Sequence, residues 1–176
     1  MAVCKVITQV SETGKAMGMT KKYHDVDTFI DVLQYVSSPN KVPTGMIGGF
    51  GVDPYQVIDQ FTRTAQIYGK TKGIHLRHII LSFSPDERVT PAQAKQIAYE
   101  IAAFYADRYQ IIFVVHTDSE NLNVHFAMNT VSYIDGRKYE GKKKDYYDFQ
   151  NHAKGVCWNY GLRLIFVSDQ QDYPIM

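Results

Sequence analysis

The chain has 176 residues, of which 45% are hydrophobic, and it carries a formal net charge of +1. This length and composition fit a single domain with a substantial core and exclude a globally basic DNA-binding surface. No apolar run approaches the roughly 20 residues that a membrane helix needs, so we expect no membrane segment.

The N-terminal strand and the two cysteines indicate the compartment. Lys5 interrupts the place where the apolar region of a signal peptide would begin. Cys4 and Cys157 lie in apolar runs and have no paired spacing, so we expect buried free thiols in a reducing compartment. The sequence therefore predicts a cytoplasmic protein.

Hydrophobic periodicity divides the first half of the chain into strands and helices. A helix over about 25–37 carries Phe29, Val32, Leu33 and Val36 on one face, at the spacings of a buried stripe. The glycine-rich stretch 46–52 is a strand or a loop of uncertain register, whose glycines let the chain approach a neighbouring strand or DNA. The other predicted elements are a strand over 3–10, a helix over 54–69 and a strand over 75–84.

The second half begins with a capped helix start at Thr90 and Pro91. This helix runs to about 107, and its predicted buried face is Ala94, Ile97, Ala98, Ile101, Ala102 and Tyr105. The later elements are strands over 109–115 and 123–129, a helix over about 145–160 that stops at Gly161, and a strand over 162–167. The pattern predicts an α+β fold in which a mainly antiparallel sheet of about five strands packs with helices.

Two histidines and an asparagine are expected to meet on one face of this sheet. If residues 117–122 form a hairpin loop, His116 and Asn123 stand opposite each other about 5 Å apart, with His125 as their diagonal neighbour. Such convergence with open positions is the layout of a catalytic metal site. Asp118 in the loop can fix an imidazole through a hydrogen bond. A histidine pair alone is more often structural, but the whole pattern on strand, loop and strand favours the site.

This segment resembles the histidine signature of conjugative and mobilisation relaxases, MobA/VirD-like members of the His-hydrophobe-His (HUH) endonuclease superfamily from Gram-positive plasmids or integrative elements. The signature usually reads His-x-Asp-x-x-x-x-His-x-His-x-x-x-Asn. His116, Asp118, His125 and Asn129 match it, whereas Asn123 takes the place of the middle histidine.

The replacement of the middle histidine by Asn123 affects which metal ion the site should bind and how tightly. Two histidines and a neutral amide should hold a divalent ion less tightly and favour the harder ions Mg²⁺ or Mn²⁺. Glu120 in the loop is a candidate for the missing ligand.

Further motifs extend the resemblance over roughly residues 3–168. Relaxases of this branch carry a nucleophilic tyrosine on an N-terminal helix, in a context like that of Tyr35, followed by a loop like that ending at Lys41. A strand like 78–87 follows, and the resemblance gives Ser82 a role in positioning the substrate. Among the thirteen tyrosines, Tyr23 is the rival nucleophile, and the motif context favours Tyr35.

The resemblance implies an enzyme that nicks one strand at a transfer origin. The tyrosine attacks a phosphodiester, gives a 5′-phosphotyrosyl intermediate with a free 3′-OH, and later allows rejoining. The implied partners are single-stranded DNA with an origin hairpin, accessory relaxosome proteins and a coupling protein, in a bacterial cytoplasm. The whole chain is expected to be one nuclease domain, in such proteins often the N-terminal part of a longer polypeptide.

A local basic segment is the predicted DNA contact, together with Lys41 and Asn129. Its cations can neutralise phosphates, and Tyr139, Tyr146 and Tyr147 beside them can stack on unpaired bases. The alternative is a solvated hairpin tip and helix start. The cations are Arg137, Lys138, Lys142, Lys143 and Lys144.

Two other functions stay open. One is a replication initiator or transposase of the same superfamily, which only the DNA substrate would distinguish. The other is a noncatalytic module that binds single-stranded DNA, made plausible by Asn123. Incubation of a labelled oligonucleotide with Mn²⁺ separates catalysis from binding.

Overall fold

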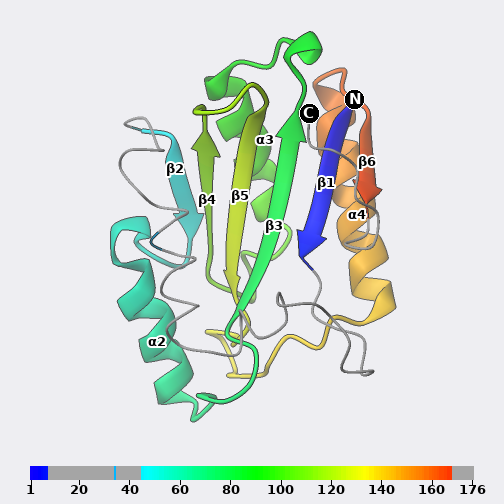
Figure 1. Cartoon of the computed structure of the whole chain (residues 1–176). Coiled ribbons are helices and arrows are strands. Elements are labelled where there is room, and N and C mark those ends of the chain that lie inside the picture. Colours follow the sequence, from blue (N-terminus) through cyan, green and yellow to red (C-terminus); the bar gives the residue numbers. More distant parts are fainter. Residues whose placement is uncertain (8–33, 35–44, 168–176) are drawn as a thin grey trace, which may run out of the picture.

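A six-stranded sheet forms the centre of the protein in this computed structural model, which describes residues 1–7, 34 and 45–167 (Figure 1). The strand order is β2-β4-β5-β3-β1-β6. The strands are β1 (Ala2–Ile7), β2 (Ile47–Phe50), β3 (Leu76–Phe83), β4 (Ile111–His116), β5 (Leu122–Asn129) and β6 (Leu164–Val167). The helices are α2 (Val57–Ile67), α3 (Pro91–Ala102) and α4 (Lys143–Asn159), with short 3-10 turns η2 (Pro54–Gln56) and η3 (Pro85–Glu87).

The sheet is mixed and mostly antiparallel, as predicted. β1 pairs antiparallel with β3 and parallel with β6, and the other neighbouring strands pair antiparallel. The strand beyond the expected five is β2 in the glycine-rich stretch. A Cβ at Gly48 would collide with the ring of Phe113 on β4. The glycines therefore allow close approach to a neighbouring strand, which was one of the two predicted uses.

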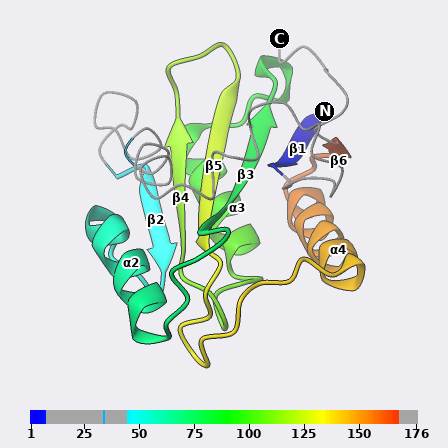
Figure 2. The same cartoon turned by 60° about the horizontal axis from the view of Figure 1, so that its bottom comes forward.

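Helices cover the two faces of the sheet differently. Figures 1 and 2 show α3 and α4 on one face, and α2 beside β2 on the other. The α3/α4 face holds the larger core, which includes the predicted helix face from Ala94 to Tyr105. A smaller cluster lies under α2, where Val57 and Phe61 meet Leu76, Ile112 and Val114.

Strand alternation assigns the polar residues to the α2 face. Residues one apart on a strand point to opposite faces. On β3, Ile79, Leu81 and Phe83 belong to the core under α3 and α4. His78 and Ser82 therefore lie on the α2 side, and their cross-strand neighbours on β5 share that face.

Several element ends differ from the sequence prediction. The helix over 54–69 begins with the 3-10 turn η2, and the helix predicted to reach 107 ends at Ala102. Turns follow the helix, and the buried ring of Tyr105 lies in a hydrogen-bonded cluster with Asp145. A tertiary contact therefore decides where α3 ends. The helix predicted over 25–37 lies outside the described residues, apart from Gln34, which is helical. The capped start at Thr90 is confirmed, with Gln93 completing a capping box.

In the described ranges the longest helix is α4 with 17 residues, and no described helix could cross a membrane.

The two thiols give a prediction for stability against pH. Cys4 and Cys157 are buried and free, as predicted, and burial raises the pKa of both, that of Cys157 from 9.0 to about 12. Below pH 9 both states keep the thiols protonated. Above it only the unfolded chain ionises them, so the free energy of unfolding should fall as pH rises from about 9 to about 12.

Urea unfolding on either side of pH 9 checks this expectation. The double variant Cys4→Ala, Cys157→Ala is the control and should show a flatter dependence. An equal slope in both proteins would contradict the assignment.

Candidate active site

Three adjacent strands, β4, β5 and β3, place polar side chains in a row on the α2 face. His116 on β4 pairs directly with Asn123 on β5, as the hairpin prediction required, and Asn123 pairs in turn with Ser82 on β3. His125 pairs with Val114 and Ile80 one step along the strands. The predicted register is therefore confirmed.

The rings of His116 and His125 lie next to each other. Their centroids are 4.5 Å apart, with an angle of 39° between the ring planes. His116 is buried and His125 is half-buried. The two imidazoles therefore lie side by side on one face of the sheet, where they are placed to act on a common group.

A third histidine, His78 on β3, joins this pair. Its Nε2 lies 3.0 Å from Nδ1 of His125, and the two ring centroids are 5.2 Å apart. From the sequence, His78 could either line the site or simply pack in the core. Because His78 and Ser82 are four residues apart on a predicted strand, the sequence indicates that they share one face of the sheet. The closeness of His78 to His125 depends on the pairing of β3 with β5.

The hydroxyl of Ser82 is buried, and it has no hydrogen-bond partner among the described residues. Buried polar atoms nearly always have a partner. Ser82 stands in the same row as Asn123 and His116, so its oxygen is suited to a ligand bound over the histidines.

The loop between β4 and β5 holds the other predicted ligands. The Asn123 amide donates to Ser119 Oγ at 2.9 Å and to the Asn121 carbonyl oxygen at 3.3 Å, so it is tied to its own loop. Asp118 and Glu120 are exposed there.

Within the described ranges, no three His, Cys, Asp or Glu side chains are arranged to hold a metal ion together. The donor chemistry still fits a divalent ion, because two adjacent imidazoles suit an ion that takes its other ligands from water and phosphate.

Asn129, which matches the last position of the signature, is a buried structural residue. Its amide donates to the Phe61 carbonyl oxygen at 3.3 Å and to Gln110 Oε1 at 3.0 Å, and its oxygen accepts from the backbone N–H of Val131. Only 2% of Asn129 is exposed. Its placement argues against the expected DNA contact and ties α2 to β5.

The predicted basic segment covers the end of the connection from β5 to α4 and the first two residues of α4, beyond the end of the sheet (Figure 1). Most of its cations have acidic partners on the surface: Arg137 with Asp135 at 3.6 Å, Lys142 with Glu140 at 2.8 Å and Lys144 with Asp148 at 2.6 Å. Exposed ion pairs are weak, so these cations stay available to phosphate.

The other two cations of the segment, Lys138 and Lys143, have different surroundings. Lys138 Nζ donates to the carbonyl oxygens of Lys72 and Ile74, and burial lowers its pKa. Lys143 is exposed at the start of α4. A cleft of about 380 Å³ opens beside this segment, with Arg108, Tyr109 and Tyr139 in its wall.

Tyr35, its rival Tyr23 and Lys41 lie outside the described residues.

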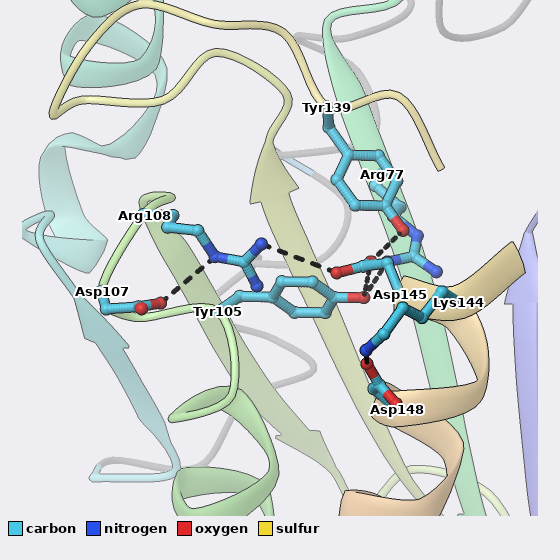
Figure 3. Close-up of polar contacts among 8 residues, drawn as sticks. All are labelled: Arg77, Tyr105, Asp107, Arg108, Tyr139, Lys144, Asp145 and Asp148. Carbon is cyan, nitrogen blue, oxygen red and sulfur yellow. Dashed lines mark hydrogen bonds and ion pairs between the residues drawn. The ribbon is translucent and has the colours of Figure 1, made fainter. Parts of the chain in front are cut away.

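A polar cluster that the sequence did not reveal lies on the opposite face of β3 (Figure 3). Asp145 on α4 accepts from the hydroxyls of Tyr139 at 2.8 Å and Tyr105 at 3.2 Å, and it pairs with Arg108 at 3.6 Å. Arg77, the residue before His78, donates to Tyr105 and lies over the ring of Tyr139, 4.6 Å from its centroid. Burial is the largest cause of the raised pKa of both phenols.

Sequence comparison relates the chain to known proteins. A family model described as "Relaxase: MobA/VirD2-like, nuclease domain" matches residues 35–162. Protein rlx of Staphylococcus aureus is 32% identical over 114 residues, which are 65% of this chain and 36% of that protein. A second rlx of S. aureus is 30% identical over 128 residues, 72% of this chain and 39% of that protein.

The Group II intron-interrupted relaxase LtrB of Lactococcus lactis subsp. cremoris (strain MG1363) is 23% identical over 143 residues, 66% of this chain and 25% of LtrB. The matches thus span between a quarter and two fifths of these curated relatives.

Proposed function

Because the chain belongs to the relaxase family with a MobA/VirD2-like nuclease domain, we propose that it nicks one strand of a transfer-origin DNA through a tyrosine nucleophile. Membership of this family implies a DNA-nicking enzyme. Residues 1–176 would act as one nuclease domain. Origin recognition by a hairpin, and contacts with accessory relaxosome proteins and a coupling protein, belong to the same proposal.

The proposed nucleophile is Tyr35. Its phenol gives up its proton as the oxygen forms a bond to phosphorus, the bond from phosphorus to O3′ breaks, and the leaving oxygen takes up a proton as the free 3′-OH. The 5′ phosphate stays on the tyrosine, so the linkage is kept for rejoining. Attack of a 3′-OH on the phosphotyrosine reverses these steps and releases the tyrosine.

The observation that carries the proposal is the row made by His116, His125 and Ser82, whose buried hydroxyl has no hydrogen-bond partner in the described part of the chain. His116 and His125 would hold a divalent ion, Mg²⁺ or Mn²⁺, which when bound polarises the scissile phosphate. Ser82 would donate its proton to a phosphate oxygen and so fix the strand over the imidazoles. Asp118 would orient an imidazole from the loop, and Glu120 and Asn123 remain secondary ligand candidates.

Covalent trapping tests the nucleophile. A labelled origin oligonucleotide incubated with Mn²⁺ should give a protein-linked product with wild type and with Tyr23→Phe, but none with Tyr35→Phe, because only the Tyr35 oxygen would be positioned for attack. Denaturing electrophoresis measures the adduct. Adduct formation by Tyr35→Phe, together with its loss in Tyr23→Phe, would move the nucleophile to Tyr23.

The basic segment is the proposed site of strand contact, with Lys41 as a further contact. Replacing Lys142, Lys143 and Lys144 by alanine should lower the salt dependence of DNA binding, since each phosphate contact adds roughly 0.7 to the slope for single strands. Binding titrations over a range of salt concentrations measure this slope. Lys154→Ala on the same helix is a control for the loss of an exposed lysine outside the segment, and an unchanged slope in the triple variant would contradict the contact.

A noncatalytic module that binds single-stranded DNA is the second candidate, because Asn123 replaces a histidine and its amide bonds its own loop. It would bind the oligonucleotide without giving a nicked product. A replication initiator or transposase would nick as well, but at a replication origin or transposon end rather than a transfer origin.

A further inference from the structure

His78 is buried within the histidine site although it lies outside the sequence signature. It is 8% exposed, and its ring stacks on that of His125 with 26° between the planes. The 3.0 Å separation of His78 Nε2 and His125 Nδ1 is that of a hydrogen bond. Two neutral imidazoles make such a bond only if one nitrogen carries the proton and the other accepts it.

The direction of this bond decides what His125 can do. If His78 donates, Nδ1 of His125 is the acceptor, and a neutral His125 must carry its proton on Nε2. If His125 donates from Nδ1, its Nε2 keeps a lone pair. Only the second arrangement lets the exposed part of the ring act as a ligand, since ligating histidines hold their other N–H in a hydrogen bond.

We propose that His78 is a positioning residue for His125, accepting its Nδ1–H and holding the ring in the tautomer with an unprotonated Nε2. The inference rests on the proposed function in one respect, namely that His125 binds a divalent ion. The tautomer itself is a property of the protein without any ion.

The opposite face of β3 explains why His78 holds its place. Its neighbour Arg77 is 9% exposed, donates to Tyr105 and lies over the ring of Tyr139 (Figure 3). Arg77 also lies over the ring of Phe149. A strand locked at residue 77 cannot rotate at residue 78 without breaking these contacts. These contacts of Arg77 thereby hold His78 against His125, so β3 both pairs with β5 and positions one of its side chains.

The need for such a group follows from Asn123. With the amide of Asn123 tied to Ser119 and Asn121, the described part of the site offers two neighbouring imidazoles, His116 and His125, as ligands. With so few ligands, the orientation of each one carries more of the binding energy. A hydrogen-bond partner that fixes the tautomer of His125 offsets part of the affinity for the ion that is lost with the third ligand.

Two measurements test the proposal. In ¹⁵N-labelled wild type without metal, long-range ¹H–¹⁵N spectra of the imidazoles should show His125 protonated at Nδ1. In His78→Phe, which keeps a ring but has no acceptor, His125 should shift towards protonation at Nε2. Calorimetric titration with Mn²⁺ should then show binding about tenfold weaker in His78→Phe, the usual cost of losing an orienting partner.

Variants of matched size sharpen the result. His78→Gln keeps an acceptor oxygen and should retain affinity within about threefold, given that the acceptor rather than the ring is what orients the ligand. His75→Phe changes a histidine just before β3 and should match wild type. These variants also keep the proposal testable if His78→Phe folds poorly.

The outcomes separate this inference from the proposed function. Protonation of His125 at Nε2 in wild type, or unchanged Mn²⁺ affinity in His78→Phe, overturns the positioning role. A loss as complete as in His125→Ala would make His78 a ligand and also overturn it. A wild-type protein with the expected tautomer and no DNA adduct instead overturns the nicking function alone.

Discussion

The variant His125→Ala should nick an origin oligonucleotide about a thousandfold more slowly than wild type, because electrostatic stabilisation of a reacting phosphate oxygen is worth about 4 kcal/mol. His125 is central to the row: its ring lies 4.5 Å from His116 and within hydrogen-bonding distance of His78. Its loss therefore removes one proposed imidazole ligand and the hydrogen bond between His125 and His78. Single-turnover nicking with Mn²⁺ measures the effect.

DNA binding by the same variant distinguishes chemistry from recognition. The basic segment follows the end of β5 at Asn129, whereas His116 and Asn123 lie at the other end of the β4–β5 pair (Figure 1). His125→Ala should therefore bind the oligonucleotide within a few-fold of wild type. His75→Ala is the control for removal of a histidine, and it should nick at the wild-type rate. Equal nicking by His125→Ala and His75→Ala would show that the histidine row is structural.

The variant Asp145→Ala should lower the free energy of unfolding by about 3 kcal/mol, the usual cost of removing one partner from a buried charged network. Asp145 accepts two tyrosine hydroxyls and pairs with Arg108, and its side chain is only 20% exposed. Its removal leaves the phenols of Tyr105 and Tyr139 without that acceptor. Thermal unfolding should show a midpoint lower by about 10 °C, at roughly 3 °C per kcal/mol for this length.

Asp148 on the same helix provides the matched control. It forms an exposed pair with Lys144, whose side chain is 87% exposed. Asp148→Ala should therefore change the free energy of unfolding by less than about 0.5 kcal/mol. Equal effects of the two substitutions would mean that burial of the Asp145 cluster adds no stability.

The hairpin register and the helix faces followed from residues close together in the chain. His116 and Asn123 are opposite each other because the loop between them is short. The buried stripe of α3 and its cap at Thr90 likewise depend on spacings of three and four residues. These patterns depend on residues only a few positions apart, so they could be predicted from the sequence.

Contacts between distant segments could not be predicted in this way. Lys138 was expected to be an available cation of the basic segment, yet its ammonium donates to the carbonyl oxygens of Lys72 and Ile74, more than sixty residues earlier in the chain. Asn129 matched a signature position and was expected to contact DNA, but the approach of α2 buries its amide against Phe61 and Gln110. In both cases a distant segment of the chain supplies the hydrogen-bond partner and thereby decides how far the polar group is exposed to solvent.

The amino-acid sequence by itself determined the family, the α+β class and the strand–loop–strand that carries His116 and His125. Only the tertiary structure decided that β3 lies beside β5, although more than thirty residues separate these strands along the chain. That pairing brings His78 to His125 and Ser82 to Asn123, and it sets Arg77 among aromatic rings on the other face. Pairing of distant strands depends on the packing of the whole core, so no spacing within the sequence reveals it.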